Sequence, residues 1–212
     1  MRVTVFGATG SVGSECVRQC LEAGHEVSAL VRTPAGLAED LRDRIRVVEG
    51  NGLDNAAVAQ ALGGGCEAVL FAIGIDKRSL ENLCTDVTRN ILALMSPTGV
   101  RRLVWCGGGS TIVEDDQVTL GAKFVEGFAR TFMGLRHRDK AHQLELLEAH
   151  KNLEWLGVRP LQMRRGPRRA EYRLGFDAYS GLSWISFADC AHAMVAMLDD
   201  DTWLHKAPIV QY

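Results

Sequence analysis

The chain has 212 residues, of which 47% are hydrophobic and 24% charged, and this is enough apolar material for one globular α/β domain. Its formal net charge of -2 gives no general attraction to nucleic acid or to an anionic membrane surface, so we expect a small-molecule partner. The apolar start of the chain reaches Gly7 too soon for a signal-peptide core or a membrane span. We therefore expect a cytoplasmic protein that does not bind membranes or nucleic acid.

The cysteines do not follow any metal or disulfide spacing. Six of them are scattered without a C-x-x-C pair, which argues against a disulfide framework and against a zinc site, and we expect no metal. Cys16 and Cys20 lie four residues apart on one helical face, where we interpret them as packing residues.

Short apolar runs alternate with helical patterns along most of the chain. Residues 3–6 predict a strand that runs into a glycine turn, residues 11–23 a helix that Gly24 ends, and residues 25–31 a second strand. Further strands are expected at 45–48, 68–72, 102–106, 154–158 and 209–210, and helices at 55–62, 79–95, 122–133, 138–149 and 188–198. This alternation predicts an α/β fold in which helices cover both faces of a parallel sheet.

The pattern changes after Pro160. Residues 162–169 form a basic loop, and residues 171–187 alternate around Asp177 and Gly181 like a hairpin. We expect one domain over residues 1–212, in which residues 161–187 form an insertion that faces the substrate.

The first turn has the glycine spacing of a dinucleotide site. Gly7 allows a sharp exit from the strand, Gly10 lets a pyrophosphate approach the backbone, and Gly13 lets the helix pack closely on the strand. The turn follows a strand, opens a helix and precedes a second strand, which is the context that the motif requires. The sequence thus predicts a Rossmann-type doubly wound sheet, with cofactor contacts at Gly7, Thr9, Gly10, Ser11, Val12 and Gly13.

The end of the second strand indicates which dinucleotide binds. An enzyme that uses NAD usually carries Asp or Glu there, but this chain has Arg32, which can pair with a 2′-phosphate. We therefore expect NADP(H), the alternative being a solvated arginine. Asn51, after the third strand, is placed near the adenine edge or else in a plain turn.

These motifs resemble the atypical short-chain dehydrogenase/reductase group, which includes NmrA-like proteins, and within it the biliverdin-IXβ reductase/flavin reductase family most. The resemblance rests on the glycine turn with Arg32 and on several segments spread along the chain: 72–74, 89–91, 99–100, 159–160, 185–192 and 211–212. It implies a reductase that transfers hydride from NADPH to a planar conjugated acceptor. It also implies a cofactor lying across the carboxyl ends of the strands, with further contacts at Ala72, Gly74, Cys106 and Gly107.

One segment departs from that family. Where the family carries a Thr-Ser pair after the fifth strand, this chain has three glycines and then Ser110 and Thr111. The hydroxyl expected beside the nicotinamide is therefore moved or absent, which argues against bilin reduction more than against cofactor binding.

The chain offers few candidates for proton transfer. Tyr172, Tyr179 and Tyr212 are not followed four residues later by lysine, so the Tyr-x-x-x-Lys pair of many short-chain dehydrogenases is missing and flavins or quinones are favoured as acceptors. Lys140 and Ser110 are the catalytic candidates that we retain. Their alternatives are a solvated helix lysine and simple turn chemistry.

A cluster of arginines follows the sixth strand. Arg164 and Arg165 are candidates for attracting a carboxylate or phosphate on the acceptor, with a solvated loop as the alternative. Two functions therefore compete: an NADPH-dependent oxidoreductase, which we favour, and an NmrA-like NADP(H)-binding regulator that senses redox state without turnover.

Overall fold

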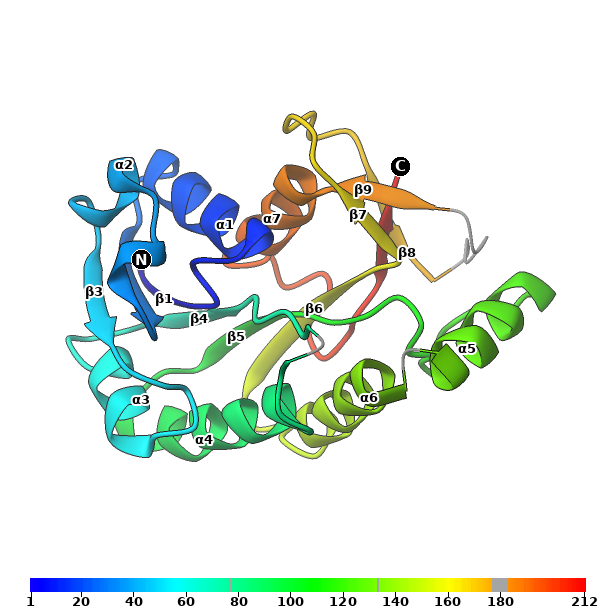
Figure 1. Cartoon of the computed structure of the whole chain (residues 1–212), viewed down its shortest axis with the longest axis horizontal. Helices are drawn as coiled ribbons and strands as arrows, with labels where there is room; N and C mark the ends of the chain where they lie inside the picture. The colour runs from blue at the N-terminus through cyan, green and yellow to red at the C-terminus, as the bar shows by residue number, and fades with distance from the viewer. Residues whose placement is uncertain (77, 133, 177–182) are drawn as a thin grey trace.

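The computed structural model describes residues 1–76, 78–132, 134–176 and 183–212 (Figure 1). Its elements in chain order are β1 (Arg2–Phe6), α1 (Ser11–Glu22), β2 (Glu26–Val31), η1 (Pro34–Gly36), α2 (Glu39–Arg42), β3 (Arg46–Glu49), α3 (Asn55–Leu62), β4 (Ala68–Phe71), α4 (Leu83–Thr98), β5 (Arg102–Cys106), α5 (Leu120–Phe132), α6 (Gly134–Glu148), β6 (Glu154–Pro160), β7 (Gln162–Arg164), β8 (Arg173–Gly175), β9 (Trp184–Ser186), α7 (Phe187–Ala196) and β10 (Ile209–Gln211).

Within these residues, eight strands form one sheet in the order β3-β2-β1-β4-β5-β6-β10-β8, and every neighbouring pair except β10 with β8 is parallel. The order reverses direction between β1 and β4, where two halves of the sheet meet. Phe6 at the end of β1 lies opposite Leu30 of β2 and Phe71 of β4, so these strands end at one edge. The predicted Rossmann-type fold is confirmed.

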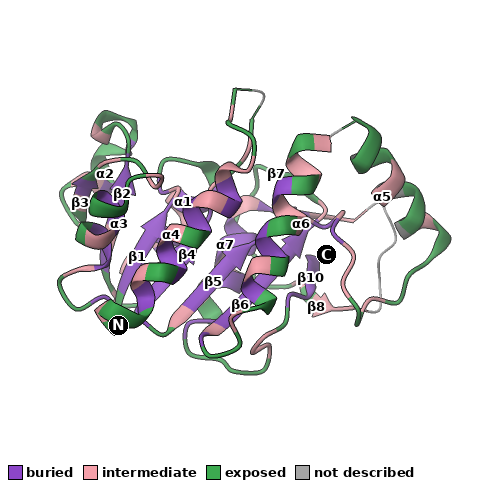
Figure 2. Cartoon of the chain, turned by 90° about the horizontal axis from the view of Figure 1, so that it is seen from below, coloured by how far each residue is buried: buried purple, intermediate pink, exposed green. Residues whose placement is uncertain are grey.

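Helices cover both faces of the sheet because successive strand residues point to opposite sides. In β1, Val5 packs into the cluster that includes residues of α1 and α7, whereas Phe6 packs into the cluster beneath α3, α4 and α6. Figure 1 shows α1, α2 and α7 above the sheet and α3, α4 and α6 below it, with α5 projecting beyond α6. Figure 2 shows the strands buried and the outer helix faces exposed.

We expected a hairpin over residues 171–187, but the two strands described in this segment, β8 and β9, do not pair with each other. β8 pairs antiparallel with β10 at the edge of the main sheet, while β9 pairs parallel with β7 in a separate two-stranded sheet. An alternating pattern predicts that a strand forms but does not identify the strand with which it pairs. Asp177 and Gly181, around which the hairpin was expected to turn, lie outside the described residues.

Two helices begin four residues away from where they were expected. The helix expected from residue 79 begins at Leu83, because Asn82 has a left-handed backbone with φ of 59°, and it ends before Gly99 with φ of 79°. The helix expected from residue 138 begins at Gly134, four residues earlier, which places His137 on its first turn.

Candidate functional site

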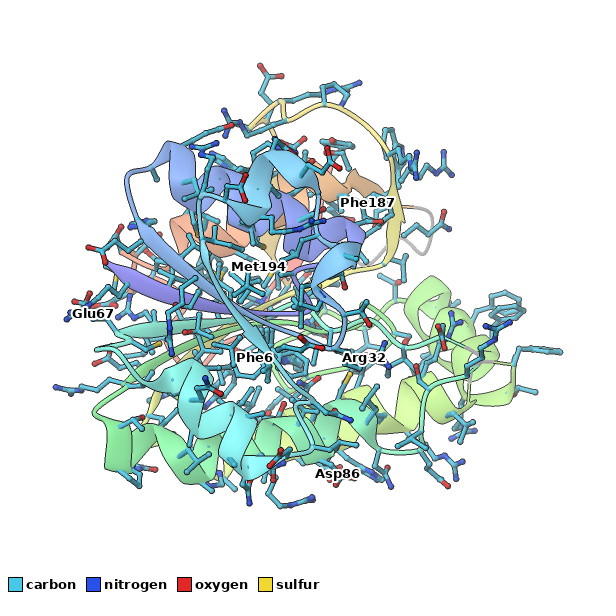
Figure 3. The ribbon with its side chains drawn as sticks, turned by 60° about the vertical axis from the view of Figure 1, so that its left-hand side comes forward. Phe6, Arg32, Glu67, Asp86, Phe187 and Met194 are labelled. Carbon is cyan, nitrogen blue, oxygen red and sulfur yellow. The ribbon has the colours of Figure 1, made fainter. Side chains whose placement is uncertain are left out.

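The carboxyl ends of the central strands border a long hollow. In the described part of the chain, a cavity of about 640 Å³ lies on the side of β2, and one of about 650 Å³ lies on the side of β5 and β6. Both sizes suit small-molecule ligands. The two cavities share Gly10 and the segment 72–75 as walls, so they form two lobes that meet at the glycine turn. Figure 3 shows Arg32 at this edge and Glu67 at the opposite edge of the sheet.

Close approach explains two of the glycines in the first turn. A Cβ on Gly7 would lie 2.6 Å from the carbonyl oxygen of Ala72, and Gly7 also has φ of 89°. A Cβ on Gly13 would lie 2.1 Å from the carbonyl oxygen of Gly7. Gly13 therefore allows α1 to rest against the turn, which is the role that we predicted from the spacing.

The start of α1 fits a pyrophosphate. Gly10 occupies the N-cap without a side chain to cap the helix, and the first hydrogen bond of the helix runs from Ser14 N–H to Gly10 O at 2.9 Å. The N–H groups of Ser11, Val12 and Gly13 precede that bond and lack partners within the helix. Together with the helix dipole, these N–H groups could bind an anion between the two lobes.

The lobe beside β2 would receive the adenosine half of a dinucleotide. Thr9, Arg32 and Asn51 line it, so three residues predicted from separate segments are brought together. Arg32 is exposed. The Asn51 side chain accepts a hydrogen bond from Leu53 N–H at 3.1 Å, so it also has the turn role that we gave as the alternative to an adenine contact. Arg78 also lines this lobe, a second cation that no sequence motif indicated.

Lys140 lies at the floor of the other lobe and is not a freely solvated helix lysine. Its Nζ donates to the carbonyl of Cys106 at 3.0 Å, to the carbonyl of Ile73 at 3.4 Å and to Gln143 Oε1 at 3.0 Å. The ammonium also lies 5.2 Å from the centre of the Phe71 ring. Lys140 thus joins α6 to the ends of β4 and β5.

The three glycines after β5 differ in how much space each would leave for a side chain. A Cβ on Gly107 would lie 2.2 Å from the Trp105 ring, and one on Gly109 would lie 2.7 Å from the Leu161 backbone. At Gly108 the nearest atom to such a Cβ is a Lys140 carbon at 3.8 Å, so a small side chain would fit there in ordinary contact. Ala72, Gly74, Cys106 and Gly107 all line this lobe, as the resemblance implied.

Ser110 meets a residue that sequence reasoning missed. Its Oγ lies 3.3 Å from Nδ1 of His137, and both side chains line the same lobe as Lys140. Burial lowers the pKa of His137 below its usual value, Glu126 opposes this effect, and Arg130 adds to it. The sequence carries one signal for His137: it lies three residues before Lys140, so the two share a face of α6 once that helix is known to begin at Gly134.

The remaining wall of this lobe is largely apolar. Phe124 and Phe128 of α5, Met163 of β7 and Phe187 of α7 contribute to it. Figure 3 shows Phe187 on the carboxyl side of the sheet. Aromatic and apolar walls of this kind suit a flat organic molecule.

Arg164 and Arg165 lie just beyond this wall rather than on it. Both are exposed, neither is among the residues that line the lobe, and the guanidinium of Arg164 lies 5.2 Å from the centre of the Trp184 ring. The lobe takes its lining here from Leu161, Gln162 and Met163 instead.

A buried ion pair holds the loop that carries Ser110. Arg159, at the end of β6, donates to both carboxylate oxygens of Asp116 at 2.5 and 2.8 Å, and also to the carbonyl of Thr111. Both charged side chains are almost fully buried. The loop after β5 is therefore fixed to the neighbouring strand.

Membrane spans and metal centres are two further kinds of feature that a chain of this length could carry. No helix within the described ranges is long and apolar enough to cross a membrane. Among the same residues, three or more His, Cys, Asp or Glu side chains do not gather in a group that could hold a metal ion.

Comparison with known proteins agrees with the site geometry. Residues 7–201 match the family model described as NAD(P)H-binding. The Bacillus subtilis (strain 168) protein YwnB is 24% identical over 206 residues, which span 94% of this chain and 92% of YwnB.

Solved structures share the fold over the whole chain. A Streptococcus pneumoniae protein provisionally named an NADH-flavin reductase has a TM-score of 0.78 and 24% identity, covering 100% of this chain and 99% of its own. ChuY, named as an anaerobillin reductase of Escherichia coli O157:H7, has a TM-score of 0.79 and 16% identity, covering 100% and 97% of the two chains. The match to the family model covers most of the chain, so together with the glycine turn and the two-lobed hollow it leads to one conclusion: the chain belongs to the NAD(P)H-binding family.

Proposed function

We propose that the protein is an NADPH-dependent reductase that passes hydride to a planar conjugated acceptor. The observation that carries this proposal is the arrangement of the two lobes on either side of the α1 N-terminus. The lobe beside β2 carries Arg32 and Arg78, and the other lobe is lined largely by apolar side chains around Lys140 and Arg136, which suits a dinucleotide lying across the sheet edge and an acceptor stacked at its far end.

The preference for NADPH rests on charge. Arg32 and Arg78 line the adenosine lobe, and a guanidinium there pairs with a 2′-phosphate that NADH lacks. Calorimetry with both cofactors tests this. We expect NADPH to bind more tightly, and Arg32→Ala to remove about 1–3 kcal/mol from NADPH binding alone. Arg101→Ala, an exposed arginine at the opposite edge, is the matched control. Equal affinities of the wild type for NADPH and NADH would refute the role of Arg32.

Bound NADPH would supply a hydride in the apolar lobe. The chain's own residues would hold and orient the reactants: the first turn of α1 would bind the pyrophosphate, and Lys140 would keep the ends of β4 and β5 together at the floor of the apolar lobe. Phe124 and Phe128 would cover part of an acceptor in this lobe.

Residues 161–187 are proposed to face the acceptor, because Leu161, Met163 and Phe187 line its lobe. Arg164 and Arg165, just outside it, are proposed to attract an anionic group on the acceptor. Replacing both arginines should raise KM for FMN, which carries a phosphate, and leave KM for an uncharged quinone unchanged.

The deciding experiment measures NADPH oxidation with FMN, FAD, quinones and bilins. Turnover with a member of this set supports the reductase.

NADPH binding without turnover would favour the second candidate, a redox-sensing regulator, for which α5 is the supporting feature. Every fourth residue from Leu120 to Phe132 is a large apolar side chain, and Phe124 is 76% exposed, so the helix offers an apolar face for a protein partner.

A further inference from the structure

We propose that Ser110 and His137 act as a proton-donating pair, and that the acceptors whose reduction depends on this pair are conjugated carbonyl compounds, quinones or enones, whereas a flavin is reduced without it. This inference rests on the proposed reductase function and specifies its substrate class. It starts from a contact in the apolar lobe that joins a hydroxyl to an imidazole, at 3.3 Å, across 27 residues of chain.

The pair lies where an acceptor would lie. Ser110 and His137 both line the apolar lobe, which Gly108 and the phenylalanines of α5 also line. Ser110 is held in place from its own loop, because Gly109 N–H donates to Pro160 O at 2.9 Å and Thr111 N–H donates to Gly108 O at 3.0 Å. The main chain of Ser110 is thus positioned before the acceptor arrives, and its Oγ lies against His137.

Lys140 does not compete for this role. Its ammonium already donates to two main-chain carbonyls and to Gln143, so its protons are directed into the floor of the lobe. The His137 ring, in contrast, meets the Ser110 hydroxyl through Nδ1 and borders the lobe in which the acceptor would lie. The imidazole is the group in this pair that can take up and release a proton near neutral pH.

The charges around His137 set the pH range in which it can donate. Glu126 and Arg130 face it from α5, while Lys140 and Arg136 lie on its own helix. Burial makes the largest contribution and lowers the pKa of His137. The protonated imidazole is therefore a stronger acid than a solvated histidine, and its population falls as the pH rises through this lowered pKa.

The step balances in atoms and electrons. Hydride from the nicotinamide forms a C–H bond at the acceptor, and the π electron pair of the conjugated carbonyl moves onto oxygen. That oxygen takes the proton of Ser110 Oγ, Ser110 takes the Nδ1 proton of the His137 imidazolium, and solvent reprotonates His137. A flavin needs no such donor, because the negative charge left by hydride transfer is delocalised over its ring system.

The test compares two acceptors in His137→Gln, Ser110→Ala and the control His142→Gln, which changes an exposed histidine on the same helix. With 9,10-phenanthrenequinone we expect His137→Gln and Ser110→Ala each to lower kcat about 100-fold, the lower end of a general acid's contribution, and with FMN less than about 3-fold. Wild-type kcat with the quinone should fall as the pH rises, and His137→Gln should lose this dependence. His142→Gln should behave as wild type with both acceptors.

A second readout needs no turnover. In the protein without cofactor, NMR titration should give His137 a pKa below the ordinary value of about 6.5, and Ser110→Ala should shift it. Equal losses with quinone and FMN, or an unchanged pH profile in His137→Gln, would overturn the pair while leaving the reductase intact. A wild type that binds NADPH and reduces neither acceptor would instead overturn the reductase and the pair with it.

Discussion

Gly13→Ala tests the contact between α1 and the glycine turn. The added Cβ would lie 2.1 Å from Gly7 O and 2.6 Å from Gly7 C, whereas ordinary contacts of this kind begin near 3.4 Å. Both obstacles are main-chain atoms, so the helix must move away from the turn by roughly 1 Å. Over-packing of this severity costs about 3 kcal/mol or more. The better helix propensity of alanine returns about 1 kcal/mol, which leaves a net loss of about 2 kcal/mol.

The assay is thermal unfolding followed by circular dichroism. For a chain of this length, about 2 kcal/mol corresponds to a fall in Tm of about 4–8 °C. Gly10→Ser is the matched control, because Gly10 has the extended backbone of an N-cap (φ -84°, ψ 166°) that serine favours. Its Cβ would lie 3.2 Å from Gly7 O, only a few tenths of an ångström inside ordinary contact, so Gly10→Ser should lower the Tm much less than Gly13→Ala does. It should lose NADPH affinity, since its side chain occupies the approach to the pyrophosphate site. A Gly13→Ala protein with the Tm of the wild type would refute the reasoning.

Three other substitutions test parts of the site in turn. Asp116→Asn leaves the buried Arg159 without its countercharge and should cost about 3–5 kcal/mol in urea unfolding. Burial acts to raise the pKa of Asp189, but hydrogen bonds from Tyr212 and from the backbone outweigh it and lower this pKa. The stability that the carboxylate adds above pH ~4 should therefore be lost as the pH falls through its folded pKa, and Asp189→Asn should reduce this loss of stability at acid pH. Lys140→Met should lower kcat by less than about 100-fold, because it removes positioning and not a proton donor, and a larger loss in steady-state assays would contradict this.

The parts of the site that the sequence predicts are those set by the main chain. Gly7, Gly10 and Gly13 follow from what a strand–turn–helix unit requires, and Arg32 follows from the end of the next strand, so the order of residues along the chain is enough to place both. The parallel sheet follows from the same alternation of elements.

The contacts missed by sequence reasoning depend on pairing between distant segments. His137 meets Ser110 across a chain separation of 27 residues, and the helix that carries it was expected to begin one residue after it. The alternation at 173–175 and 184–186 predicts strands, but their partners, β10 and β7, are decided by where the sheet edges lie in space. The place of Phe124 and Phe128 in the lobe could not be predicted either, because an amphipathic pattern does not specify what the apolar face of a helix contacts.

Because the ion pair between Arg159 and Asp116 is buried, the two ends of the site should respond differently to ionic strength. Water and salt ions do not reach these two side chains, so screening leaves the loop of Ser110 in place at high salt. Arg32 is exposed at the other end of the hollow, so the attraction that we propose between it and a 2′-phosphate should weaken as counterions accumulate. If the proposal holds, raising the salt concentration will weaken cofactor binding at one end of the hollow while the end near Ser110 keeps its shape, so the two ends respond separately.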